Sequence, residues 1–177
     1  MCLRPGTGAN KLAPVSTRDP RPTISTSPDE VVRSSRGTVT LAELRALCDV
    51  VEPGIVRFRE HPDANVEVFT TLVRIAAELG EPFGDFAVIV DLRAAQNRPG
   101  PDMVQAISKS VRSVGIHWAT VQSGNLAIRT IAKFVMTRLA GPGVSIHANL
   151  DDAIAACREA LARGRRRDPH DAGDERR

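Results

Sequence analysis

The sequence predicts a single, three-layer-like α/β domain, in which helices cover a mostly parallel sheet and an N-terminal hairpin precedes a βαβαβα core. From residue 86 onward, strand-like segments alternate three times with helix-like segments through short connections, which is the order of right-handed βαβ crossovers. The chain has 177 residues, 42% of them hydrophobic. That length is sufficient for one well-buried domain and short for two.

The two ends of the chain differ from its middle in composition. Residues 1–21 contain Pro5, Pro14 and Pro20 and show neither helical nor strand periodicity. Residues 163–177 alternate arginine with acidic residues and contain no large apolar side chain. Such segments cannot bury enough apolar surface to offset the entropy lost on ordering. We therefore predict a disordered arm over 1–21, a folded domain over 22–162 and a disordered tail over 163–177.

The first part of the domain reads as a hairpin followed by a helix. Two β-prone runs, residues 23–27 and 31–36, are separated by a turn-forming Ser-Pro-Asp-Glu stretch. Thr40 and Glu43 then form a T-x-x-E capping box, which predicts a helix start. Apolar residues continue at helical spacing until Pro53-Gly54, and they form the stripe Leu41, Leu44, Leu47, Cys48 and Val51.

A second helix follows a segment that the pattern leaves open. Residues 55–64 fit either a short helix or a strand. Asn65 is a suitable N-cap, apolar residues keep helical spacing after it, and Gly80 is a suitable end.

The second half of the domain contains the predicted core strands. Residues 86–92 (FAVIVDL) form an apolar run typical of a strand buried on both faces. A helix opening at Asp102 and Gln105 follows, then a strand over 116–121 and a helix over 126–139. A strand over 144–147 and a helix beginning at Asp151 complete the pattern.

Three segments together resemble the STAS fold, the domain of anti-sigma-factor antagonists and sulfate-transporter tails, and especially its divergent bacterial STAS-like relatives. Residues 31–40 (VVRSSRGTVT) are similar to the entry into the first helix, and residues 88–92 (VIVDL) to the central strand. Residues 144–154 are similar to the closing strand and helix. The resemblance covers residues 22–162 and implies a regulatory domain that binds a protein partner.

The chain departs from that family in two places. In regulatory STAS domains a serine shortly after the central strand is phosphorylated by a partner kinase, whereas residues 98–102 here read RPGPD and contain no hydroxyl. The resemblance therefore implies that this phosphorylation switch is absent. The helix predicted over 65–80 is the second departure, and it suggests a modified surface on one side of the sheet.

Charge and cysteine content narrow the classes of function. The pI of about 9.1 arises in the two ends, and residues 29–162 carry a net charge of −2, which disfavours nucleic-acid binding by the domain. The three cysteines, Cys2, Cys48 and Cys157, are widely spaced and odd in number, which favours a reducing cytoplasm. No apolar run is long enough to span a membrane.

Polar residues follow the predicted strands at the edge where open α/β sheets bind ligands. These candidates for binding a ligand or partner are Asp91, Arg93, Gln96, Asn97, Ser123 and Asn125, together with Asn149. Ser123 or Asn125 at a helix start could bind an anion, but we favour a simple capping role. Asp91 and Arg93 could form a functional pair, and we favour a loop-capping role for this aspartate as well.

Motifs for chemistry are missing from the sequence. It has neither of the glycine-rich nucleotide motifs, so we expect no cofactor, and it has no recognisable nucleophile elbow or Cys-His pair, so we name no catalytic residue. His117 and His147 lie on adjacent βα repeats and could approach each other, but a metal would need a third ligand and we expect none.

These observations lead to three hypotheses about function. The leading one is a non-enzymatic regulatory or protein-interaction module without the phosphoacceptor serine. It would bind a protein partner and could form a homodimer. The alternative is a carrier of a small apolar or anionic ligand, because the helices over 66–79 and 126–139 could enclose an apolar pocket. The third is an enzyme that uses Asp91, Arg93 and Ser123.

Overall fold

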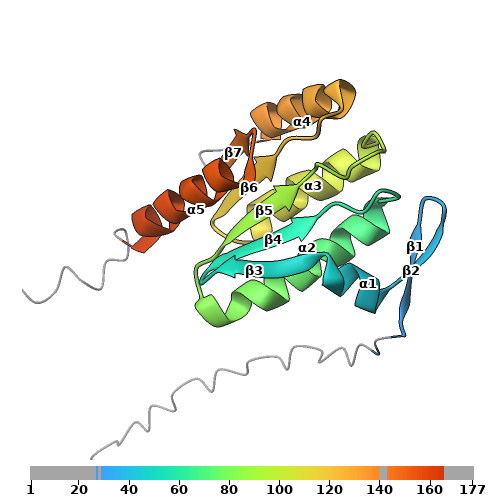
Figure 1. Cartoon of the computed structure of the whole chain (residues 1–177), viewed down its shortest axis with the longest axis horizontal. Helices are drawn as coiled ribbons and strands as arrows, with labels where there is room; N and C mark the ends of the chain where they lie inside the picture. The colour runs from blue at the N-terminus through green and yellow to red at the C-terminus, as the bar shows by residue number, and fades with distance from the viewer. Residues whose placement is uncertain (1–26, 28, 140–142, 166–177) are drawn as a thin grey trace, which may run out of the picture.

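The computed structural model describes residues 27, 29–139 and 143–165 and confirms the predicted α/β class. Its centre is a five-stranded sheet in the order β3-β4-β5-β6-β7 (Figure 1). Strand β3 runs antiparallel to β4, and the other neighbours pair in parallel. The strands are β3 (Cys48–Glu52), β4 (Ile55–Arg59), β5 (Ala87–Asp91), β6 (His117–Val121) and β7 (Val144–His147).

Helices cover both faces of this sheet. The crossover helices α2 (Val66–Gly80), α3 (Pro101–Ser113) and α4 (Leu126–Leu139) join successive parallel strands and lie on one face, and a short 3-10 helix, η1 (Glu81–Phe83), follows α2. Because each crossover connects neighbouring strands in the same direction across the sheet, a constant hand places all three helices on one side. Helix α5 (Leu150–Arg165) packs on the opposite face against β4 to β7.

The predicted α2 start and stop are confirmed. The side chain of Asn65 accepts a hydrogen bond from the Val68 amide at 2.9 Å, so it caps the helix as expected. The helix ends at Gly80, and the ambiguous segment before Asn65 contains strand β4.

The N-terminal hairpin uses different strands from those predicted. Strand β1 (Val31–Ser34) pairs with β2 (Gly37–Thr40), whereas the sequence pattern paired residues 31–36 with 23–27, of which 23–26 lie outside the described residues. Gly37 adopts φ 155°, which favours glycine where the chain leaves the turn. Val32 and Val39 face each other across the hairpin and are both buried in the core, which fixes this register.

The first helix is shorter than predicted. The capping box is confirmed, since the Thr40 amide donates to the Glu43 carboxylate at 2.8 Å and the Glu43 amide donates to the Thr40 hydroxyl at 3.2 Å. Helix α1 (Leu41–Ala46) then ends, and the prediction that it continues to Val51 was wrong. Residues 48–52 form edge strand β3 because Pro53 and Gly54 turn the chain back to pair with β4.

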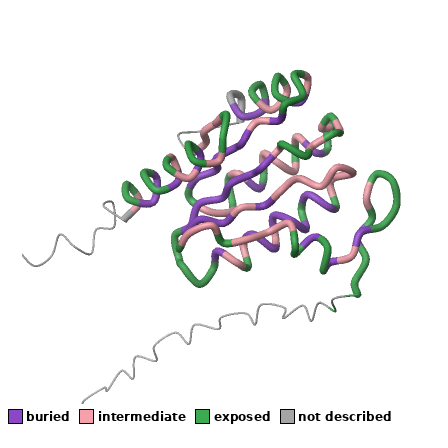
Figure 2. Tube along the Cα trace, in the orientation of Figure 1, coloured by how far each residue is buried: buried purple, intermediate pink, exposed green. Residues whose placement is uncertain are grey.

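Strands β5 and β6 are buried along their whole length (Figure 2), and alternation of their side chains separates two cores. Val56, Phe58 and Trp118 point toward α2 and α3, and Phe58 contacts the Trp118 ring edge to face at 6.2 Å between centroids. Ile55 and Ile89 point to the other face and pack against α5. All residues of β5 and β6 are buried, as predicted for strands covered on both faces.

The ordered structure at the C-terminal end runs past the predicted boundary. Helix α5 continues to Arg165, whereas the sequence placed the end of the domain at residue 162. No helix in the described part of the chain combines the length and apolarity needed to cross a membrane.

Candidate binding cavity

A cavity of about 500 Å³ lies between the sheet and helices α2, α3 and α4. It sits over the carboxyl ends of β4, β5 and β6, the edge at which the sequence placed candidate ligand-binding residues. Helix α3 packs mainly on α2, and α4 packs mainly on β7, so the space between them over the central strands remains open. Apolar side chains dominate the wall, namely Phe69, Val90, Met103, Ile107, Trp118, Ile128, Val135 and Met136.

Glu60 brings a carboxyl group into this apolar cavity. It directly follows β4, where its amide donates to the Asp91 carbonyl at 3.0 Å, and strand alternation turns it to the same face as the core residue Phe58. The residue as a whole is half-buried, but burial of its carboxyl raises the pKa to about 7. Among the described residues, no hydrogen bond or ion pair to this carboxyl is found.

Thr120 supplies the second polar group. It lies in β6, is only 2% exposed and lines the cavity, and its hydroxyl oxygen has no hydrogen-bond partner in the described part of the chain. A buried hydroxyl without a partner costs roughly 1–3 kcal/mol. This side chain is therefore available to a bound molecule.

Other polar groups around the cavity are already engaged. The Trp118 indole N–H donates to the Val114 carbonyl at 2.6 Å, so its ring presents an apolar surface. The Asn97 amide donates to the Pro62 carbonyl at 2.9 Å and to the Ser35 hydroxyl at 3.2 Å. These bonds hold the loop after β5 against the segment after β4 and leave Glu60 and Thr120 as the interior polar groups without partners.

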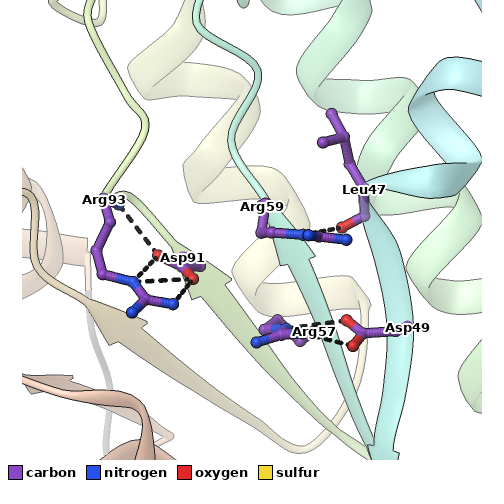
Figure 3. A network of polar contacts seen from close by, with 6 residues as sticks. All are labelled: Leu47, Asp49, Arg57, Arg59, Asp91 and Arg93. Atoms are coloured by element: carbon purple, nitrogen blue, oxygen red, sulfur yellow. Dashed lines mark hydrogen bonds and ion pairs between the residues drawn. The ribbon is translucent and has the colours of Figure 1, made fainter.

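Asp91 and Arg93 lie on the other face of the sheet (Figure 3). Asp91 is only 2% exposed. The Arg93 guanidinium donates two hydrogen bonds to its carboxylate, from Nε to Oδ1 at 2.9 Å and from Nη2 to Oδ2 at 2.6 Å. Burial alone would raise the pKa of Asp91, but the hydrogen bonds from Arg93 outweigh burial and lower it. Arg57 forms a similar fork with Asp49 at 2.9 and 2.5 Å. The Arg57–Asp49 pair joins β4 to β3, the Asp91–Arg93 pair lies at the end of β5, and neither pair faces the cavity.

The other candidates divide between the cavity and helix caps. Gln96 and Asn97 line the cavity. The Asn125 side chain accepts from the amides of Ala127 and Ile128 at 3.0 and 3.4 Å, and the Ser123 hydroxyl accepts from the Asn125 amide at 3.1 Å. Asn125 therefore caps α4, whereas Ser123 holds the turn before the helix. Asn149 likewise caps α5 by accepting from the Asp152 amide at 2.9 Å.

His117 and His147 approach each other through a shared serine. Their Nε2 atoms lie 2.9 and 2.7 Å from the Ser145 hydroxyl, which has one hydrogen and so donates to one ring and accepts from the other. Burial lowers the pKa of His117. Within the described residues, no group of three His, Cys, Asp or Glu side chains is placed to hold a metal ion.

Sequence reasoning missed Glu60 and Thr120. Glu60 lies in the segment that could be assigned to neither helix nor strand, and Thr120 lies inside an apparently structural strand. Once 55–59 is assigned as a strand, alternation alone would turn residue 60 to the same face as Phe58.

Comparisons with protein-family models, with curated proteins and with solved structures gave no match to this chain.

Proposed function

We propose that this domain is a non-enzymatic module that binds one small, largely apolar molecule in the cavity between the sheet and helices α2, α3 and α4. The size and lining of the cavity are the observations that support this proposal. Its volume of about 500 Å³ is typical of small-molecule sites, and apolar walls with a few placed polar groups are the usual composition of such sites. This corresponds to the ligand-carrier alternative raised by the sequence.

Helix α4 could link ligand binding to the proposed regulatory role, because it borders both the cavity and the surface. One side of this helix contributes Ile128, Val135 and Met136 to the cavity wall, while Leu126 at its start is 66% exposed. An exposed leucine on a helix that contacts the ligand favours a partner-binding surface on α4 whose position responds to the ligand. The resemblance to STAS domains supports such a role, and here residues 98–102, at the end of the loop and the start of α3, line the cavity and include no hydroxyl that could accept a phosphate.

The enzyme hypothesis gains no support from the proposed active-site residues. Both carboxylate oxygens of Asp91 are held by Arg93, and the Ser123 hydroxyl is engaged by a backbone amide. In the arrangement observed, the Asp91 carboxylate is held in an ion pair, and the Ser123 hydroxyl supports the turn before α4.

Trp118 is a built-in reporter for the test. It is the sole tryptophan of the chain and lines the cavity, so a bound aromatic probe should change its emission. Three probes of matched shape and different charge are suitable: naphthylmethylamine, naphthalenemethanol and naphthoic acid. We expect saturable one-site binding of at least one probe, and native mass spectrometry of freshly purified protein should show a bound small molecule.

Two matched variants separate cavity binding from surface binding. Ala132→Phe places a ring in the cavity wall and should abolish binding, whereas Ala155→Phe adds the same ring on an exposed position of α5 and should not. Absence of binding for all three probes, together with empty purified protein, would refute the proposed function. Equal binding by both variants would also refute it.

A further inference from the structure

We propose that the molecule bound in this cavity is an apolar amine, whose positively charged end pairs with the Glu60 carboxylate and whose far end carries a hydrogen-bonding group that meets Thr120. This inference rests on the proposed ligand-binding function and specifies its ligand class. It is carried by the position, charge and lack of partners of these two side chains.

The charge balance of the cavity favours a cation. Besides Glu60, the titratable or charged side chains that line it are His61, Arg98 and Asp102. Arg98 and Asp102 are exposed at the rim and carry opposite charges, so they offset one another. The ionised Glu60 carboxylate therefore has no compensating charge inside the cavity. A ligand ammonium supplies the missing partner, whereas an anionic group at this place meets like-charge repulsion.

The register of the sheet sets the shape of the ligand. Phe58, Val90 and Thr120 occupy one row across β4, β5 and β6, and Glu60 lies two residues beyond Phe58 on the same face. Two strand spacings separate β4 from β6, and Glu60 lies two residues further along its strand, so the Cα atoms of Glu60 and Thr120 are roughly 12 Å apart. The surface between them is formed by Val90 and Leu92 beside the ring of Trp118. A ligand that reaches both groups therefore has an apolar middle.

Protonation of Glu60 adds a testable signature. Its pKa of about 7 means that roughly half of the carboxyls are protonated at neutral pH, and an amine pairs with the ionised form. Amine affinity should therefore rise through neutrality and level off above it, with roughly a tenfold gain between pH 6 and pH 8. His61 also lines the cavity beside Glu60 and is a titratable side chain, so the contribution of Glu60 is isolated by substitution.

The experiment measures Trp118 quenching by naphthylmethylamine, naphthalenemethanol and naphthoic acid at pH 6 and pH 8. In the wild-type protein, the amine should bind at least tenfold more tightly than the alcohol or the acid at pH 8. Glu60→Gln should remove both this preference and the dependence on pH that Glu60 contributes, and Glu60→Asp should weaken amine binding while retaining its pH trend. Glu30→Gln, a change at an exposed glutamate outside the cavity lining, should leave the amine preference in place.

The outcomes distinguish this inference from the function on which it rests. If the alcohol or acid binds best, or if Glu60→Gln leaves amine affinity unchanged, the cationic ligand class is wrong while the cavity remains a binding site. If no probe binds and the purified protein is empty, or if Ala132→Phe binds the probes as tightly as Ala155→Phe does, the proposed function itself fails. Thr120→Val, which replaces a hydroxyl with a methyl group of similar size, should not affect these small probes but should weaken binding of an amine long enough to reach both groups.

Discussion

Replacing Glu60 with glutamine should stabilise the protein above neutral pH and have little effect under acidic conditions. The folded state raises the pKa of this carboxyl from 4.5 to about 7 because it desolvates the charged form. The folded protein therefore binds the proton more tightly than the unfolded chain. Stability from this group is fully present below pH 4.5 and is lost as pH rises through 7.

The size of the effect follows from the same shift. At 1.36 kcal/mol for each pH unit between the two pKa values, the free energy of unfolding falls by at most roughly 3 kcal/mol between acidic and alkaline conditions. Glu60 is half-buried rather than sealed from solvent, so about 1–3 kcal/mol is a reasonable range. Glutamine keeps the shape and carries no charge, and it should recover this amount at pH 8.

Urea unfolding at pH 5 and pH 8 checks the prediction. The wild type, Glu60→Gln and a control, Glu30→Gln, are compared, since Glu30 is an exposed glutamate before the hairpin. His117 has a lowered pKa and should reduce stability as pH falls below about 6.5, but it is present in all three proteins and cancels in the differences. The reasoning is refuted if Glu60→Gln gains no stability over the wild type at pH 8, or if Glu30→Gln gains as much.

Two further predictions concern packing and cysteine reactivity. A Cβ at Gly80 would overlap the ring of Phe86, so Gly80→Ala should lower the free energy of unfolding by about 1–3 kcal/mol, whereas Gly100→Ala, in open space, should change it by less than about 1 kcal/mol. Equal urea midpoints for the two variants would contradict this packing. Burial raises the pKa of Cys48 and of Cys157 to about 12, so both side chains should remain thiols at pH 8. In a Cys2→Ser variant, neither should react with an aromatic disulfide reagent until the protein unfolds. Rapid modification of the native variant would show that these thiols are accessible.

The sequence by itself determined the elements whose signals are local. The capping box at Thr40 and the N-cap Asn65 each placed a helix start correctly, because their hydrogen bonds join residues only three apart. The unbroken apolar run at residues 86–92 identified the central strand, since only a segment covered on both faces lacks alternation. The alternation after it predicted the parallel sheet.

Tertiary pairing decided what the local pattern left ambiguous. The apolar stripe through Leu47, Cys48 and Val51 fits a helix, but pairing of residues 48–52 with β4 made it an edge strand. Because residues 55–59 form a strand, Glu60 faces the cavity. Side chains alternate along β5, so Asp91 lies on the opposite face of the sheet, where Arg93 donates to it. Which face a strand residue occupies, and how far burial moves its pKa, depends on neighbours distant in sequence, and those neighbours are assembled only in the folded chain.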